Sequence, residues 1–299
     1  MIITDYPKFV NLDEYNSLIT KIVDSLSKIN IVKNIYQIGH ISTLGISDID
    51  LVIIFENDKK TNHNPRENLS KNDRYLIKHG LFGIPQKFLQ AAQNYTFFHN
   101  YNILFGAPNK FEKEINNVDE MILKKQIALE FLLKMYATII IQKTYGVIRL
   151  RSLFLHVKAL QYDFEFLNVK SAKLLDLVNE FIEWRENWFD NKIENQKILD
   201  WVNVFFIELE KFLEHYLIKE NFYLRSNPSK INNFTNILKS KNLSYSHRGY
   251  LFPTFTLSSK KLYNLSHRFN KFVINVPFST DTKESIIKER EKFNVSIRN

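Results

Sequence analysis

The sequence predicts an α+β fold in two parts: a small mixed sheet with flanking helices over residues 1–117, and a mostly α-helical domain over residues 118–299. Three observations lead to this prediction. Two short runs of β-forming residues, 35–38 and 51–55, flank a glycine-containing turn. Residues 119–144 contain no Gly or Pro and are apolar at helical spacing. Further helical patterns follow that stretch, so we place the domain boundary near residue 117.

The elements of the first part follow in chain order. Residues 11–27 predict an amphipathic helix, because their apolar side chains recur at helical spacing (Leu12, Tyr15, Leu18, Ile19, Ile22, Val23 and Leu26). Residues 57–74, whose only aliphatic or aromatic residue is Leu69, predict a polar loop of the kind that closes over substrates, with room for a short helix. Residues 80–106 are mixed, with a short helix from Pro85 and extended structure over 95–105, and a break follows at 106–108.

The second part is predicted from helical patterns at residues 119–144, 148–167, 171–189 and 192–219, with a weaker one over 283–293. Residues 226–277 include short strand-like pieces such as 250–257. Trp184 and Trp188 lie four residues apart on one helix and indicate a core or a domain interface. Arg149 and Arg151, near a helix start, are candidates for surface salt bridges or for phosphate contact.

The composition limits the function classes. The 299 residues include no cysteine, which excludes disulfides, cysteine nucleophiles and thiolate metal sites. The net charge of +9 favours an anionic partner such as a nucleotide, nucleic acid or a membrane surface, although lysine-rich drift in an A·T-rich genome explains it equally well. No apolar run reaches the roughly 20 residues that span a membrane, and no secretory signal is evident, so we expect a cytoplasmic protein without a membrane span.

The residues that suggest chemistry are Asp48 and Asp50, at the entrance of the apolar strand 51–55. Side chains at positions i and i+2 share one face of a strand, so the two carboxylates are expected side by side, with Ile49 pointing into the core. Two such carboxylates repel each other unless a cation lies between them. Mg²⁺ is usually held by one or two carboxylates together with phosphates. The sequence therefore predicts a site for Mg²⁺, or for Mn²⁺, at this strand.

The turn before these aspartates is rich in small and hydroxyl-bearing residues, which let backbone N–H groups approach phosphate oxygens (Gly39, Ser42, Thr43, Gly45 and Ser47). A strand, a glycine-containing turn and an Asp-x-Asp motif entering an apolar strand resemble the polymerase-β-like nucleotidyltransferase superfamily. The match runs from Gly39 through Ser47-Asp48-Ile49-Asp50-Leu51. The motif covers residues 37–55 and the resemblance in fold covers the first 115 residues, while the helical second half also suits the superfamily.

The resemblance implies transfer of a nucleoside monophosphate from a nucleoside triphosphate to an acceptor, with metal ions stabilising the attacking and leaving oxygens. Asp48 and Asp50 would be the catalytic metal ligands. Gly39, His40, Ser42 and Ser47 would contact the nucleotide. The acceptor is unidentified, and a small molecule or a protein is favoured over RNA because the chain has no concentrated basic tract.

The sequence departs from the superfamily pattern at two points. His40 stands where Ser or Gly usually follows the first glycine. The third carboxylate, normally supplied by a later strand, is replaced by Asn102 in the best-placed strand, and an amide cannot act as a base. Glu56, Glu112 and Glu114 are weak substitutes. Residues 78–80 and 102–106 also resemble a divergent branch of the superfamily that lacks the third acid, which would add His79 and Asn102 to the site.

Three functions therefore stay open. The first is a nucleotidyltransferase. The second is a catalytically silent protein of the same fold that binds a nucleotide or a partner, suggested by Asn102. The third is a basic, mostly helical nucleic-acid-binding protein in which the aspartate pair is incidental; its affinity should fall steeply with salt. A zinc site among Glu208, Glu210 and His215 is not supported, because their spacing suits a solvated helix face.

Overall fold

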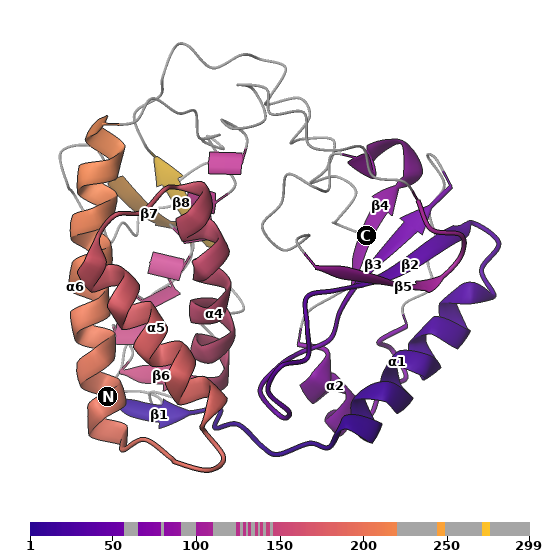
Figure 1. The fold of residues 1–299 in the computed structure, drawn as a ribbon, viewed down its shortest axis with the longest axis horizontal. Coiled ribbons are helices and arrows are strands. Elements are labelled where there is room, and N and C mark those ends of the chain that lie inside the picture. The colour runs from indigo at the N-terminus through magenta and orange to yellow at the C-terminus, as the bar shows by residue number, and fades with distance from the viewer. Residues whose placement is uncertain are drawn as a thin grey trace. The chain divides into compact units, whose positions relative to one another are not determined.

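The computed structural model describes residues 1–56, 65–78, 81–90, 100–109 and 146–219, scattered positions between 124 and 143, and the backbone at 244–248 and 271–275. Contacts divide the chain into two compact units, unit 1 (Met1–Tyr6 and Lys125–Thr282) and unit 2 (Pro7–Lys124 and Lys283–Asn299). The division near residue 124 lies close to the expected boundary at 117. The first six residues differ from expectation, because they belong with the later unit (Figure 1).

Unit 2 is built on a four-stranded mixed sheet in the order β4-β3-β2-β5. The central strand β2 runs antiparallel to both β3 and β5, and β4 is parallel to β3. The strands span β2 (Val32–Ile38), β3 (Asp50–Phe55), β4 (Phe82–Pro85) and β5 (Tyr101–Phe105), and a 3-10 turn, η1 (Gln86–Phe88), follows β4. The apolar run of β3 is buried from Leu51 to Ile54, as expected of a strand covered on both faces.

Two helices, α1 (Leu12–Ser27) and α2 (Lys71–Leu76), pack against one face of this sheet (Figure 1). The predicted helix over 11–27 is confirmed. It begins at a capping box in which the Asn11 side chain accepts from the Glu14 N–H at 2.9 Å and the Glu14 carboxylate accepts from the Asn11 N–H at 3.2 Å. Its apolar stripe joins one core with β2, β3 and α2 (Tyr15, Leu18, Ile19, Ile22, Leu26, Ile35, Ile49, Leu51, Ile53 and Leu76).

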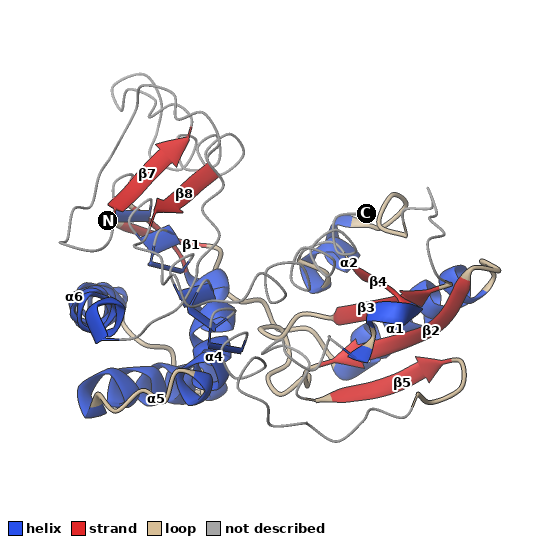
Figure 2. Cartoon of the chain, turned by 90° about the horizontal axis from the view of Figure 1, so that it is seen from above, coloured by secondary structure: helices blue, strands red, loops and turns tan. Residues whose placement is uncertain are grey.

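The described part of unit 1 includes three continuous long helices, α4 (Leu150–Phe166), α5 (Ala172–Glu186) and α6 (Asn195–Lys219). These agree with the predicted helical stretches, and the described positions between 124 and 143 are helical as well. Helix α5 packs against both α4 and α6 (Figure 2). Aromatic rings join the three helices: the Phe181 ring lies 4.8 Å from that of Phe154 and 4.1 Å from that of Trp201. Trp184 and Trp188 are buried, which confirms the core placement.

Two strand pairs complete the described part of unit 1. Strand β1 (Ile2–Thr4) pairs in parallel with β6 (Val147–Arg149), and β7 (Ser244–Arg248) pairs antiparallel with β8 (Lys271–Asn275). The expected helix start at residue 148 is therefore shifted, because residues 147–149 are held extended by β1. The predicted pieces 250–257 and 283–293, and residues 57–64 of the predicted loop, lie outside the described residues. No described helix is both long enough and apolar enough to cross a membrane.

Candidate functional site

Three strand ends meet at one edge of the unit 2 sheet. Because β2 runs antiparallel to both neighbours, its last residue lies beside the first residues of β3 and β5. The register pairs Ile38 with Asp50 on one side and with Tyr101 on the other. This edge therefore gathers the turn after β2, the aspartates before β3 and the start of β5.

Asp48 and Asp50 flank a buried residue at this edge. Ile49 is 1% exposed and belongs to the core below α1 and α2. Its backbone N–H donates to the Leu76 carbonyl oxygen at 2.9 Å, so the last turn of α2 fixes the peptide between the two aspartates. Both aspartates are partly exposed, and Oδ1 of Asp50 is enclosed by protein atoms. Asp48 and Asp50 therefore directly precede and follow an anchored residue.

The glycines of the preceding turn serve different purposes. Gly39 has φ +73°, and no atom of the other described residues beyond its two chain neighbours lies within 4 Å of where a Cβ would stand. Its N–H donates to the Asn100 carbonyl oxygen at 2.7 Å, so it extends the pairing of β2 with the chain before β5. Gly45 has φ +79°, and a Cβ there would lie 2.1 Å from the Lys8 carbonyl oxygen. Gly45 is needed for this close backbone approach.

Two tyrosines hold the turn, and sequence reasoning did not identify either as part of the site. The buried Tyr15 hydroxyl donates to the Ser47 carbonyl oxygen at 2.7 Å and accepts from the Gly45 N–H at 3.0 Å. The Tyr75 hydroxyl donates to the Gly45 carbonyl oxygen at 2.6 Å and accepts from the Lys8 N–H at 2.8 Å. Their positions on α1 and α2 match the apolar spacing of a core, which conceals the hydroxyl groups.

The predicted nucleotide-binding residues separate into a buried and an exposed group. Ser47 is 3% exposed, and its Oγ accepts from the Thr43 N–H at 3.2 Å, so this hydroxyl closes the turn from inside. His40 and Ser42 are exposed, and the Ser42 N–H donates to the His40 carbonyl oxygen at 3.0 Å. The outer surface of the turn near the aspartates is therefore formed by His40 and Ser42 rather than by Ser47.

The register does not bring Asn102 to the aspartates. Asn102 pairs with Gln37, which pairs with Leu51, and Leu51 belongs to the core under α1. Directly paired residues point to the same face, so Asn102 lies on the helix-covered face and Asp50 on the opposite one. On the side away from β2, the described strand that borders β3 is β4, which carries no carboxylate. Glu56 follows the far end of β3, whereas His79, Glu112 and Glu114 lie outside the described residues.

The two aspartates at this edge suit a metal site that is completed by ligands from a bound molecule and not by the protein alone. The described residues contain no group of three or more His, Asp or Glu side chains that could hold a metal ion. Two carboxylates alone match the usual protein contribution to a Mg²⁺ site in which phosphates and water fill the remaining positions. Asp48 and Asp50 therefore fit a metal that arrives with a phosphorylated ligand.

Tyr101 is the exposed aromatic residue of this edge, and sequence reasoning overlooked it. Its side chain is 39% exposed and meets the buried Tyr36 ring edge-on, with ring centres 5.8 Å apart and planes at 85°. The Tyr36 hydroxyl accepts from Asn109 Nδ2 at 2.9 Å, which fixes the supporting ring. Partial burial, with a smaller contribution from Tyr36, raises the pKa of the Tyr101 phenol above its ordinary value.

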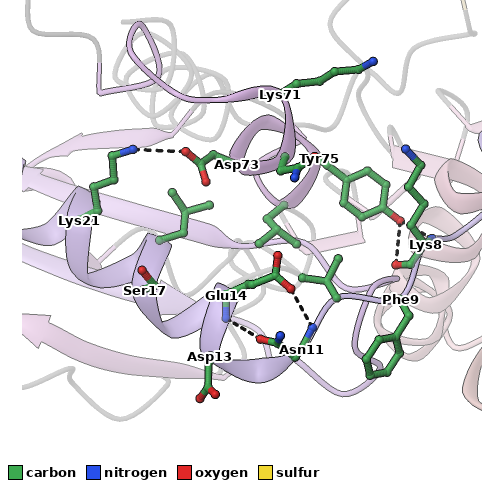
Figure 3. Close-up of a pocket in the computed structure, with 14 residues that line it drawn as sticks. Lys8, Phe9, Asn11, Asp13, Glu14, Ser17, Lys21, Lys71, Asp73 and Tyr75 are labelled. Carbon is green, nitrogen blue, oxygen red and sulfur yellow. Dashed lines mark hydrogen bonds and ion pairs between the residues drawn. The ribbon is translucent and has the colours of Figure 1, made fainter.

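A cavity of about 620 Å³ lies elsewhere on unit 2, between α1, α2 and the segment before α1 (Figure 3). None of the predicted site residues lines it. Three lysines and three acids line it (Lys8, Lys21, Lys71, Asp13, Glu14 and Asp73), so it carries no net charge. Partial burial opposes ionisation of Asp73, but hydrogen bonds from Ser70 and Lys21 outweigh it and lower the pKa of this carboxyl group. The cavity therefore indicates no particular ligand.

The remaining polar candidates are structural in the described chain. Arg149 forms an ion pair with Asp5 at 3.2 Å, which is the predicted salt-bridge alternative, and Arg151 is buried at 2% exposure. Glu208 accepts from Lys173 at 3.1 Å and from Lys211 at 3.0 Å, and these hydrogen bonds lower the pKa of its carboxyl group.

Comparison of the chain with protein-family models, with curated proteins and with solved structures finds no match in any of the three.

Proposed function

We propose that this protein is a nucleotidyltransferase that moves a nucleoside monophosphate from a nucleoside triphosphate to an acceptor, with a metal-dependent site at Asp48 and Asp50. One observation carries the proposal. The two carboxyl groups flank the anchored, buried Ile49 at the entrance of a central strand, directly after a turn with two positive-φ glycines. On this proposal, unit 2 is a divergent polymerase-β-like nucleotidyltransferase domain, and the rest of the chain is a mostly α-helical second domain.

Each residue has a definite task in this proposal. Asp48 and Asp50 bind the cation through carboxylate oxygens, and the hydrogen bond from Ile49 N–H to Leu76 holds their backbone in place. His40 and Ser42, on the outer surface of the turn, donate to phosphate oxygens. The bound cation, Mg²⁺ or Mn²⁺, supplies charge stabilisation to the oxygens that attack and leave phosphorus. The acceptor is a small molecule or a protein, since the basic residues of the chain are dispersed.

A second candidate function follows from a specific observation. The described strands that border β2 and β3 carry no third carboxylate, and Asn102 lies on the other face of the sheet. A protein with this site could bind a metal–nucleotide complex and use it to recognise a partner, without transferring the nucleotide. This alternative predicts nucleotide binding without pyrophosphate release.

The test is thermal stabilisation of the full chain by each of the four ribonucleoside triphosphates, with and without Mg²⁺. A ligand bound only by the native state raises the melting temperature by mass action. We expect one nucleotide to stabilise the wild-type protein when Mg²⁺ is present, and to have no effect on Asp48→Ala plus Asp50→Ala. Absence of stabilisation by all four would contradict both candidates. Pyrophosphate release with added acceptors then separates transfer from binding alone.

A further inference from the structure

The edge of the sheet that holds the aspartates also presents an aromatic surface. Tyr101 shares the row of paired residues that contains Ile38 and Asp50, so the Tyr101 ring and the Asp50 carboxylate stand on the same face. Neighbouring strands lie about 4.8 Å apart, which separates the Asp50 and Tyr101 backbones by about 10 Å. A nucleotide spans such a distance from its polyphosphate to its base.

The backbone at the edge of the sheet next to this row is exposed at Gly39, whereas Ile38, which stands between Asp50 and Tyr101 in the row, is 4% exposed. Gly39 follows Ile38 and pairs through its N–H with Asn100, directly before Tyr101. Among the described residues, and apart from the two neighbours of Gly39 in the chain, no atom lies within 4 Å of the position where a Gly39 Cβ would stand. A ligand that reaches from the aspartates to the tyrosine would therefore pass along the main chain at Gly39, where a larger side chain would obstruct it.

The Tyr101 ring is suited to stacking because it is both supported and exposed. Tyr36, 2% exposed, holds it edge-on, and Asn109 holds Tyr36 through hydrogen bonds of 3.2 Å from its backbone N–H and 2.9 Å from Nδ2. A ring fixed in this way loses little side-chain freedom when a flat ligand covers it. Stacking on tyrosine tolerates any base, because every base has a π face.

We propose that Tyr101, supported by Tyr36, is the platform on which the base of the nucleoside triphosphate stacks while Asp48 and Asp50 engage its polyphosphate through the cation. The inference rests on the proposed function. It assigns the base-binding surface of that site to strand β5 and gives the exposed Tyr101 ring a role there. It also separates two contributions to binding, one from the base and one from the phosphates.

Calorimetric titration of the full chain with ATP, GTP, CTP and UTP, and with inorganic triphosphate as a ligand lacking a base, tests this assignment in the presence of Mg²⁺. Tyr101→Leu keeps an apolar side chain on the strand but removes the ring, and we expect it to raise the dissociation constant of the bound nucleotide about tenfold or more. The dissociation constant of inorganic triphosphate should stay within about twofold of wild type, because the phosphate contacts remain.

Two variants serve as matched controls. Tyr101→Phe keeps the ring and should bind the nucleotide like the wild-type protein. Asn102→Ala changes the next residue of the same exposed strand, on the other face of the sheet, and should also leave binding unchanged. Thermal unfolding of each variant without ligand verifies that unit 2 is intact.

The outcomes separate this inference from the proposed function. Nucleotide binding by Tyr101→Leu at wild-type strength would overturn the stacking assignment and leave the aspartate site standing. An equal loss of nucleotide and inorganic triphosphate would also overturn it, because the effect would then not arise from the base. Absence of binding of any triphosphate to the wild-type protein would overturn the proposed function and this inference together.

Discussion

The two glycines of the turn before the aspartates permit a matched test of its geometry. Gly39→Ala and Gly45→Ala both place an alanine at positive φ, which costs an L-residue about 1–2 kcal/mol. They differ in the surrounding space. No described residue crowds the Gly39 position, whereas a Cβ at Gly45 would lie 2.1 Å from the Lys8 carbonyl oxygen, so the Lys8 backbone or the turn would have to move.

That movement has a cost that the structure allows us to estimate. Lys8 is tied to the Tyr75 hydroxyl through its N–H at 2.8 Å, so the segment cannot shift without disturbing the contact that also holds the turn. Overpacking of this kind costs about 1–3 kcal/mol. We therefore expect Gly39→Ala to lower the free energy of unfolding of unit 2 by about 1–2 kcal/mol, and Gly45→Ala by about 2–5 kcal/mol.

The assay is hydrogen exchange of the α1 amides, which measures the opening free energy of unit 2. Tryptophan fluorescence during urea unfolding serves as an internal control, because all three tryptophans of the chain, Trp184, Trp188 and Trp201, lie in unit 1. Equal destabilisation by the two substitutions would mean that positive φ alone accounts for both, and that the close approach of Gly45 to Lys8 adds nothing to the stability of unit 2.

Three further predictions concern stability. Tyr15→Phe should lower the stability of unit 2 by about 2 kcal/mol, because two buried backbone groups lose their hydrogen-bond partner; a loss below about 0.5 kcal/mol in α1 exchange would contradict this. Phe181→Ala should destabilise unit 1 by about 3–5 kcal/mol in urea unfolding followed by tryptophan fluorescence, whereas Ile207→Ala, at a position 47% exposed, should stay within about 0.5 kcal/mol. Burial, reinforced by Arg185, lowers the pKa of Lys158 below its ordinary value of 10.5, so the charged form is disfavoured in the fold at neutral pH. Lys158→Met should therefore raise the free energy of unfolding of unit 1 at pH 7. This gain should shrink as the pH rises from the lowered pKa toward 10.5, because the wild-type lysine loses its proton in the folded state at a lower pH than in the unfolded chain. Urea unfolding at pH 7 and at pH 10 measures this gain, and unchanged stability at pH 7 would count against it.

The local patterns of the sequence were sufficient to predict α1, α4, α5, α6 and the central strands β2 and β3. The spacing of Leu18, Ile22 and Leu26 predicts the stripe of α1 that lies in the core, and the structure adds the capping box of Asn11 and Glu14 at its start. Alternation alone predicts a buried Ile49 between two partly exposed aspartates, as the structure has it. These features depend on residues close together in the chain, where periodicity and capping chemistry act directly.

Long-range pairing could not be predicted in the same way. Strand β1 pairs with β6 through Ile2 and Val147, which no local pattern connects. Strand β4 is only four residues long and contains Gly83 and Pro85, so it reads as a turn until its pairing with β3 is known. Such short elements owe their conformation to a partner strand and not to their own propensity.

The composition of the site depended on register in the same manner. The polar residue before the apolar run of β5 is Asn102, which made it the natural substitute for a third acid. Because Gln37 pairs with both Leu51 and Asn102, the Asn102 side chain lies on the face covered by α1. Tyr101, the preceding residue of β5, lies instead on the face that carries Asp50. A shift of one residue in the pairing of β2 with β5 would move every β5 side chain to the opposite face of the sheet. The register changes at an irregularity between Ile35 and Tyr36, and no residue pattern in the sequence marks that irregularity.

Binding of a metal–nucleotide complex at Asp48 and Asp50 can be measured by electron paramagnetic resonance of Mn²⁺ in the presence of the stabilising nucleoside triphosphate. We expect the wild-type protein to hold Mn²⁺ only when the nucleotide is present, because two carboxylates complete a metal site with phosphate oxygens. Asp48→Asn and Asp50→Asn should each abolish this bound signal, while Asp24→Asn, an exposed change on α1, should preserve it. Equal binding of Mn²⁺ by the wild-type protein, Asp48→Asn and Asp50→Asn would contradict the proposal that these two aspartates hold the metal.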